Sequence, residues 1–163
     1  MFKAGILTVS DKGHAGERHD ASGPELAGLL PAANFQVAAM AVVPDEREAI
    51  AAQLVQWCDQ ERLGLILTTG GTGLSPRDVT PEATLLVAER LVPGLPEAMR
   101  AAGLAKTPHA MLSRGVAVIR GRTLIINLPG SPKGARENLA AVAAALPHAL
   151  EKLRGSPAEC GAE

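Results

Sequence analysis

Aromatic side chains are almost absent from this chain of 163 residues. The aromatics are Phe2, Phe35 and Trp57, and the chain contains no tyrosine. Proteins that bind single-stranded nucleic acid stack the bases on aromatic rings, so this composition argues against that function. It also means that the hydrophobic core must be built from aliphatic side chains.

Net charge, cysteine and long apolar runs are also scarce. The formal net charge of −1 gives no overall electrostatic attraction to nucleic acid or to a membrane surface. The two cysteines, Cys58 and Cys160, have the spacing of neither a disulfide scaffold nor a metal site, and we expect Cys58 to pack as a small hydrophobic residue on a helix. No apolar run approaches the roughly 20 residues that span a bilayer, and residues 1–6 have a strand pattern rather than that of a signal peptide. We therefore expect a soluble, reduced, cytoplasmic protein with no nucleic-acid or membrane partner.

Strand and helix patterns alternate along the chain. Strands are predicted over residues 2–9 and 35–43, from Leu65 onward, and over 116–120 and 123–127, the last two as a hairpin. Helices are predicted over residues 22–30, from Asp45 past Cys58, and over 81–90, 95–104 and 132–153. Within 81–90, we expect Leu85, Leu86 and Ala88 to face the sheet. These patterns predict one α/β domain over residues 1–154, a three-layer sandwich around a mostly parallel sheet with one antiparallel edge strand, followed by a frayed tail over 155–163.

The strand that begins at Leu65 runs into a glycine-rich stretch at residues 68–73. Glycines let the backbone turn sharply and approach a ligand closely, and successive N–H groups can cradle an anion. Arg77 and Asp78 follow, and Thr80 and Pro81 then have the pattern of an N-cap and a first helical residue. The spacing fits neither a P-loop nor a dinucleotide fingerprint. A plain tight turn therefore remains one interpretation, and a ligand site at the end of a central strand is the other.

Two acidic residues, Asp45 and Asp78, follow predicted neighbouring strands. The carboxyl ends of parallel strands lie on one edge of a sheet, so both carboxylates can face one cleft. Two carboxylates that share a Mg²⁺ ion with a substrate's phosphates are an ordinary way to handle ATP. Asp45 can equally be a helix cap, and Asp78 can be a turn former, so both interpretations remain open.

The segment Asn127–Lys133 is a third candidate. Ser131 and Pro132 have the pattern of an N-cap followed by proline, and Lys133 adds a cation. A helix N-terminus with a hydroxyl and a cation suits a phosphate. A capped helix with a solvated lysine fits the same residues. The four histidines have no metal-ligand spacing, and we expect Arg100, Arg114 and Arg120 to be solvated or paired.

Taken together, these segments resemble the molybdopterin adenylyltransferases, the Mog family of molybdenum-cofactor biosynthesis proteins. Related domains occur in MoaB-type proteins, gephyrin, plant Cnx proteins and MoeA-type proteins. The matching segments run in order from the first strand to the last helix: residues 8–12, 43–46, 68–73, 77–84 and 128–133.

The resemblance implies a trimeric α/β fold and a Mg²⁺-dependent reaction, in which the terminal phosphate of molybdopterin attacks the α-phosphate of ATP and pyrophosphate leaves. A separate MoeA-type protein would then use the product for molybdate insertion. By the same resemblance, Asp45 and Asp78 are the catalytic and metal-binding acids. The residues expected to bind the substrates are Ser10, Asp11, Thr69, Gly70, Gly71, Thr72, Gly73, Arg77, Pro129, Gly130, Ser131 and Lys133.

Two rival functions remain at this stage. One is a MoaB-type module that binds molybdopterin and transfers nothing. The other is a flavodoxin-like regulator that binds a nucleotide without any need for a pterin. Pyrophosphate release from Mg-ATP in the presence of molybdopterin separates the enzyme from both.

Overall fold

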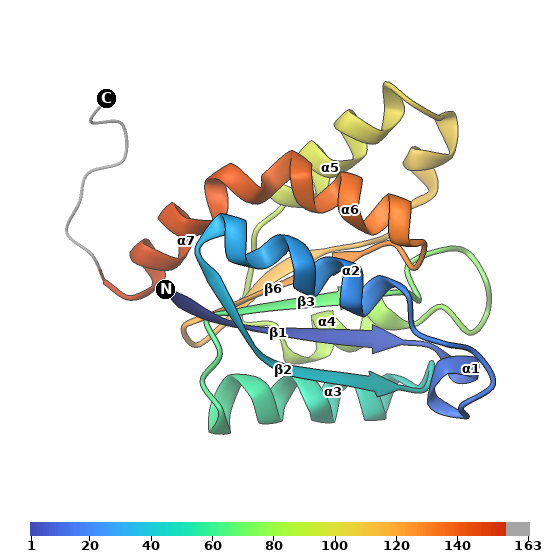
Figure 1. Ribbon diagram of the computed structural model, residues 1–163, viewed down its shortest axis with the longest axis horizontal. Coiled ribbons are helices and arrows are strands. Elements are labelled where there is room, and N and C mark those ends of the chain that lie inside the picture. The colour runs from blue at the N-terminus through green and yellow to red at the C-terminus, as the bar shows by residue number, and fades with distance from the viewer. Residues whose placement is uncertain (156–163) are drawn as a thin grey trace.

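Six strands form one sheet in the order β2-β1-β3-β6-β5-β4, with helices on both faces (Figure 1). The computed structural model describes residues 1–155, so the predicted tail beyond Gly155, with Cys160, lies outside the described residues. The strands are β1 Phe2–Val9, β2 Phe35–Val43, β3 Leu65–Thr69, β4 Arg90–Leu91, β5 Ala117–Arg120 and β6 Thr123–Leu128. The helical elements are α1 Asp11–His14, α2 Ser22–Leu29, η1 Leu30–Ala33, α3 Arg47–Val55, η2 Gln56–Gln60, α4 Thr80–Val87, α5 Gly94–Leu104, η3 Pro108–Leu112, α6 Pro132–Val142, η4 Ala143–Ala145 and α7 Leu146–Leu153.

Four of the strands run parallel. β1 pairs with β2 and β3, and β3 pairs with β6, all in the parallel sense. β5 is antiparallel to β6, which confirms the predicted hairpin, and Gly121 in its turn has φ +55°. The three-layer prediction is therefore correct. The antiparallel edge was also predicted correctly, and it contains one strand more than expected, because the two-residue strand β4 pairs in the antiparallel sense with the outer side of β5.

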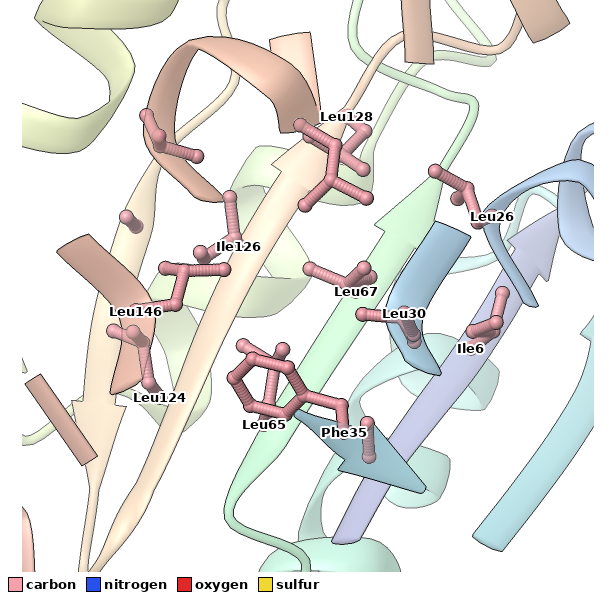
Figure 2. Close-up of a cluster of buried hydrophobic side chains, with 14 of the residues drawn as sticks. Ile6, Leu26, Leu30, Phe35, Leu65, Leu67, Leu124, Ile126, Leu128 and Leu146 are labelled. Atoms are coloured by element: carbon pink, nitrogen blue, oxygen red, sulfur yellow. The ribbon is translucent and has the colours of Figure 1, made fainter. Parts of the chain in front are cut away.

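The two faces of the sheet carry separate aliphatic layers, as the period of a strand requires. Leu65 and Leu67 point to the layer covered by α2, α6 and α7, whereas Ile66 points to the layer covered by α3 and α4. Figure 2 shows the first layer, in which Phe35 is the largest fully buried side chain. Burial of these continuous apolar runs on both faces explains why the parallel strands were visible in the sequence.

Trp57 is the largest side chain of the second layer. It is 3% exposed and packs over Gly5 in the middle of β1. A Cβ atom at Gly5 would lie 2.8 Å from the indole and 2.7 Å from Leu63, so only glycine fits beneath the ring. Cys58 is buried beside it, as predicted, and burial raises the pKa of its thiol to about 11.

Helix α4 corrects two predictions. It ends at Val87 rather than at residue 90, which frees Arg90 and Leu91 to form β4. The side chains of Leu85 and Leu86 are 46% and 61% exposed, and the core is instead contacted by Ala83 and Val87. Among the helices of the described residues, none combines the length and the apolar character needed to cross a membrane.

Candidate functional site

A cavity of about 520 Å³ lies at the carboxyl ends of the parallel strands. This is where open α/β sheets place their ligands. Loops that follow β1, β2, β3 and β6 all contribute to its wall. Eight of the predicted site residues line it: Ser10, Asp45, Thr69, Gly70, Gly71, Asp78, Gly130 and Ser131.

The glycines after β3 form a floor that no other residue could form. Gly70 has φ +102°, and a Cβ atom there would lie 2.3 Å from the carbonyl oxygen of Val9. Gly71 has φ +67°, and its Cβ would lie 2.3 Å from the hydroxyl of Thr80. That hydroxyl donates to the Gly70 carbonyl at 2.8 Å. Thr80 was predicted to be the N-cap of α4. It is instead the first residue of the helix, and the N-cap is Val79. The turn is tight, and it also lines the cavity.

Asp45 does not cap a helix. The N-cap of α3 is Glu46, and Oδ2 of Asp45 instead accepts the backbone N–H of Asp11 at 2.8 Å. Asp11 returns the contact, because its Oδ1 accepts the backbone N–H of Asp45 at 2.9 Å. These reciprocal hydrogen bonds join the loops that follow β1 and β2.

Arg77 joins the loop after β3 to the same pair. Its Nε and one terminal nitrogen donate to the two oxygens of Asp11 at 3.0 and 2.8 Å. This fork holds the pKa of Asp11 below its usual value, whereas burial raises the pKa of Asp45, with the negative charges of Asp11 and Asp78 adding to the effect. Asp11 thus serves as an anchor, and Asp45 is the carboxylate that faces the cavity.

Asp78 has two roles. Its Oδ2 accepts the backbone N–H of Ser75 at 2.9 Å, so it does form the turn that the sequence suggested. Asp78 also lines the cavity, together with Asp45. In each of these two carboxylates, Oδ1 accepts no hydrogen bond from another of residues 1–155.

A divalent ion fits this donor set. Mg²⁺ is commonly held by one or two carboxylates together with substrate phosphates and water, rather than by a full protein cage. Asp45 and Asp78 supply two carboxylates on one wall, and the described part of the chain has no cluster of three or more His, Cys, Asp or Glu side chains that could hold a metal ion without a substrate.

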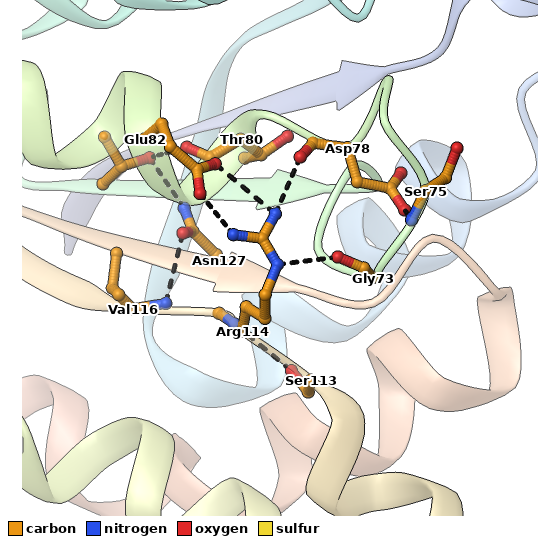
Figure 3. Close-up of polar contacts among 11 residues, drawn as sticks. Gly73, Ser75, Asp78, Thr80, Glu82, Ser113, Arg114, Val116 and Asn127 are labelled. Carbon is orange, nitrogen blue, oxygen red and sulfur yellow. Dashed lines mark hydrogen bonds and ion pairs between the residues drawn. The ribbon is translucent and has the colours of Figure 1, made fainter.

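Arg114 holds the loop that carries Asp78 in place. The sequence did not reveal this role of Arg114. As Figure 3 shows, its guanidinium donates to the carbonyl of Gly73 at 2.8 Å, to that of Asp78 at 2.7 Å and to the carboxylate of Glu82. Its backbone N–H donates to the Thr72 carbonyl at 2.9 Å. The bonds to Arg114 hold the pKa of Glu82 below its usual value. Arg114 is paired, as predicted, but with main-chain carbonyls of the site.

A buried amide fixes the sheet beneath this loop. Nδ2 of Asn127, on β6, donates to the hydroxyls of Thr68 on β3 and Thr84 on α4, both at 2.9 Å. Its Oδ1 accepts the backbone N–H of Val116 at 3.2 Å. The amide therefore has a structural role and does not face the cavity.

The segment that leads into α6 forms another part of the cavity wall. Ser131 is the N-cap, as predicted, and its Oγ accepts the N–H of Gly134 at 3.1 Å. Thr69 donates its hydroxyl to the Pro129 carbonyl at 2.7 Å, and Ser22 does the same to Gly130 at 2.7 Å. Ser22 is the first residue of α2, which begins where the helix was predicted to begin.

Three further predicted residues line an adjoining cavity. Thr72, Gly73 and Pro129 line a second cavity of about 320 Å³, which shares Ser131 with the first. Asp11, Arg77 and Lys133 line neither of these two cavities. Lys133 is exposed on α6, and Asp11 and Arg77 act through the loop anchor described above.

The loop after β1 supplies the lining residues that sequence reasoning missed. Arg18, His19 and Asp20 line the main cavity together with Ser22. Asp20 is fixed by the hydroxyl of Thr8 at 2.7 Å and the N–H of Gly23 at 3.0 Å. The position of this long polar loop directly after a parallel strand was the signal that could have found them.

Comparison with known proteins agrees with this geometry. Residues 5–148 match a family model described as a probable molybdopterin binding domain. The chain is 45% identical over 145 residues to a molybdopterin adenylyltransferase of Haemophilus influenzae, covering 87% of this chain and 73% of that protein. It also matches a crystal structure of the molybdopterin biosynthesis enzyme MoaB from Thermus thermophilus with a TM-score of 0.91 and 59% identity, over 98% of this chain and 100% of that one.

Longer relatives contain the same domain as one part. The chain is 45% identical over 163 residues to gephyrin of Dictyostelium discoideum, covering 94% of this chain. It spans about a quarter of the length of that protein and of the cinnamon protein of Drosophila melanogaster, 23% and 24% respectively.

Proposed function

Because this chain belongs to the molybdopterin-binding domain family, we propose that it is a molybdopterin adenylyltransferase. Its substrates would be ATP and molybdopterin. A terminal phosphate oxygen of molybdopterin attacks the α-phosphorus of ATP and forms a new P–O bond, while the bond from that phosphorus to the bridging oxygen breaks and pyrophosphate leaves with the electron pair. The substrate supplies the nucleophile, so the protein has only to position the reactants and stabilise charge.

One observation carries this proposal: Asp45 and Asp78 reach the same cavity from different strands. A Mg²⁺ ion held by these two carboxylates would neutralise phosphate charge. Arg18 and Ser131, at the N-terminus of α6, both line this cavity and suit the phosphates of a nucleotide. Gly70 and Gly71 let the backbone approach the ligand, and the adjoining cavity leaves room for a second substrate.

Assembly, location and hand-over extend the same proposal. The exposed leucines on α4, Leu85 and Leu86, favour a homotrimer that buries them. The protein would act in the cytoplasm and pass its product to a MoeA-type molybdate insertion protein.

The test is replacement of Asp78 by asparagine, measured as pyrophosphate release from Mg-ATP with molybdopterin present. Asp78→Asn keeps the acceptor for the Ser75 N–H but removes the charge. We expect turnover to fall at least about a hundredfold, with molybdopterin affinity unchanged. Glu48→Gln is the matched control, because Glu48 is exposed on α3 and pairs only with Arg47. Normal turnover of Asp78→Asn would disprove the metal role.

The wild-type chain decides between the enzyme and the binding module. Saturable molybdopterin binding without any pyrophosphate release would favour the MoaB-type module that transfers nothing.

A further inference from the structure

A cavity at the opposite end of the sheet gathers three arginines. It measures about 550 Å³ and is lined by the segments that precede β3 and β6, by η2 and by the end of α7. The five residues of β3, at about 3.3 Å each, separate it from the main cavity by roughly 17 Å. The two cavities share no lining residue.

The ion pairs of the described residues show which arginines have a carboxylate partner and which do not. Five arginines pair with carboxylates: Arg47, Arg77, Arg114, Arg120 and Arg136. Arg100 donates to two main-chain carbonyls instead. Of the other arginines, Arg18 lines the main cavity and Arg90 is exposed on β4. The cavity at the opposite end is lined by Arg62, Arg122 and Arg154, none of which forms an ion pair within residues 1–155.

Among the described residues of the wall, the single carboxylate does not cancel this charge. Asp59 is held by both oxygens in a fork from Arg120, at 3.0 and 2.7 Å. That contact holds the pKa of Asp59 below its usual value. The charge therefore concentrates locally in a chain whose formal net charge is −1.

The arginines are set on a fixed frame. Arg62 has φ +52°, a conformation unfavourable for a residue with a side chain. The next residue, Leu63, holds it in place, because its N–H donates to the Trp57 carbonyl at 3.0 Å and its carbonyl accepts the Thr123 hydroxyl at 2.6 Å. The guanidinium of Arg154 lies 4.2 Å from the centre of the Phe2 ring, a contact that orients the group and leaves its charge in place.

We propose that this cavity binds a diphosphate or longer polyphosphate group. Guanidinium groups match phosphate oxygens with paired N–H donors, and forks from three separate segments can grip more than one phosphate at once. The volume is in the range of small-molecule sites. Cys58 and Leu63 give the floor an apolar part beside the charges. The site does not depend on the proposed adenylyl transfer.

The test is a titration of the ¹⁵N-labelled full chain with inorganic pyrophosphate at constant ionic strength. Saturable shifts of the Gly64 and Thr123 amide signals are expected. The Arg62→Gly/Arg122→Ser double variant should weaken this binding at least about tenfold. Glycine accepts the backbone angle of Arg62, and serine suits the hairpin turn, so the variant keeps its fold. Arg47→Ser, which removes an exposed arginine elsewhere, should bind as the wild type does.

Three outcomes would overturn the site. Shifts confined to Gly70 and Gly71 would place pyrophosphate in the main cavity alone, and the proposed function would stand unaffected. Equal affinity in the double variant would show that the arginines are not the ligands. Binding of citrate as tightly as pyrophosphate would remove the assignment to phosphates. Pyrophosphate release by the double variant is measured in parallel and should match the wild type.

Discussion

The loops around the main cavity are held in two different ways. The loop after β3 is fixed through its backbone: Gly70 sits against the Val9 carbonyl, and Arg114 grips the carbonyls of Gly73 and Asp78. The loops after β1 and β2 are joined by the reciprocal hydrogen bonds of Asp11 and Asp45, and this pair is tied to the rest of the site by the exposed ion pair between Asp11 and Arg77. Close backbone contacts and several hydrogen bonds from one side chain are costly to break. Exposed ion pairs contribute little to the free energy of unfolding, and their contribution changes with pH and salt.

This difference places rigidity where it is useful. The loop that carries Asp78 and the glycine floor cannot move without breaking backbone contacts. Asp45 is oriented by a partner, Asp11, whose own anchor is exposed to solvent. Three substitutions probe the contrast.

The largest effect is expected at the glycine floor. Gly70→Ala places a methyl group 2.3 Å from a main-chain oxygen at φ +102°, and should lower the free energy of unfolding by about 3 kcal/mol or more. Urea denaturation measures it. Gly121→Ala is the control: φ there is +55° and its Cβ would meet nothing within 4 Å, so only about 1 kcal/mol of backbone strain is expected. Equal losses in the two variants would contradict the close-approach argument.

An intermediate effect is expected at Arg114. Arg114→Met keeps the length of the side chain but leaves two carbonyls and Glu82 without their donor. We expect a loss of about 2 kcal/mol together with reduced turnover, since Asp78 loses its brace. Arg136→Met removes a single ion pair whose arginine is 50% exposed and should cost less than about 1 kcal/mol. If both variants behaved alike, Arg114 would be an ordinary surface arginine.

The smallest effect is expected at Asp11, and it should depend on pH. Arg77 keeps the pKa of Asp11 below its ordinary value of 3.8 in the folded protein, so the charged form stabilises the fold above that pH and the contribution is lost as the pH falls through the folded pKa. Asp11→Asn should therefore lower the urea midpoint slightly at pH 7, and by progressively less as the pH falls below 3.8. Added salt should shrink the difference.

The double variant with Arg77→Gln is the control for this pair. Because one interaction is removed by either change, the double should be no less stable than the single variants, and additive losses would speak against the pairing.

The sequence predicted the strands better than their surroundings. β1 and β2 were predicted with the observed bounds. β1 is buried and almost continuously apolar, as a central parallel strand is expected to be, whereas β2 is an edge strand in which only Phe35 is buried. β4 was missed, since a two-residue strand with both side chains exposed carries no apolar pattern. Leu85 and Leu86 were predicted to face the sheet, because leucine on a helix usually packs into the core, but both side chains are exposed.

The candidate site shows the same division. Asp45, Asp78 and the glycines could be predicted to lie together because each follows a parallel strand, and the carboxyl ends of parallel strands lie on one edge of a sheet. The anchor role of Asp11 and the brace at Arg114 could not be predicted, since both depend on contacts between segments more than 30 residues apart. Arg18 lies in a loop without periodicity, so the sequence gives no indication of which side chains of that loop face the cavity.

Because the indole of Trp57 lies on Gly5, the chain contains a natural optical probe. It is the sole tryptophan, and no tyrosine competes for excitation. Its emission therefore reports one event, the docking of the α3–η2 segment onto the central strand. Trp57 fluorescence can therefore follow the refolding of this side of the sheet without an added label. Because the neighbouring residue Cys58 lines the arginine-lined cavity, the same fluorescence also reports structural changes near that cavity.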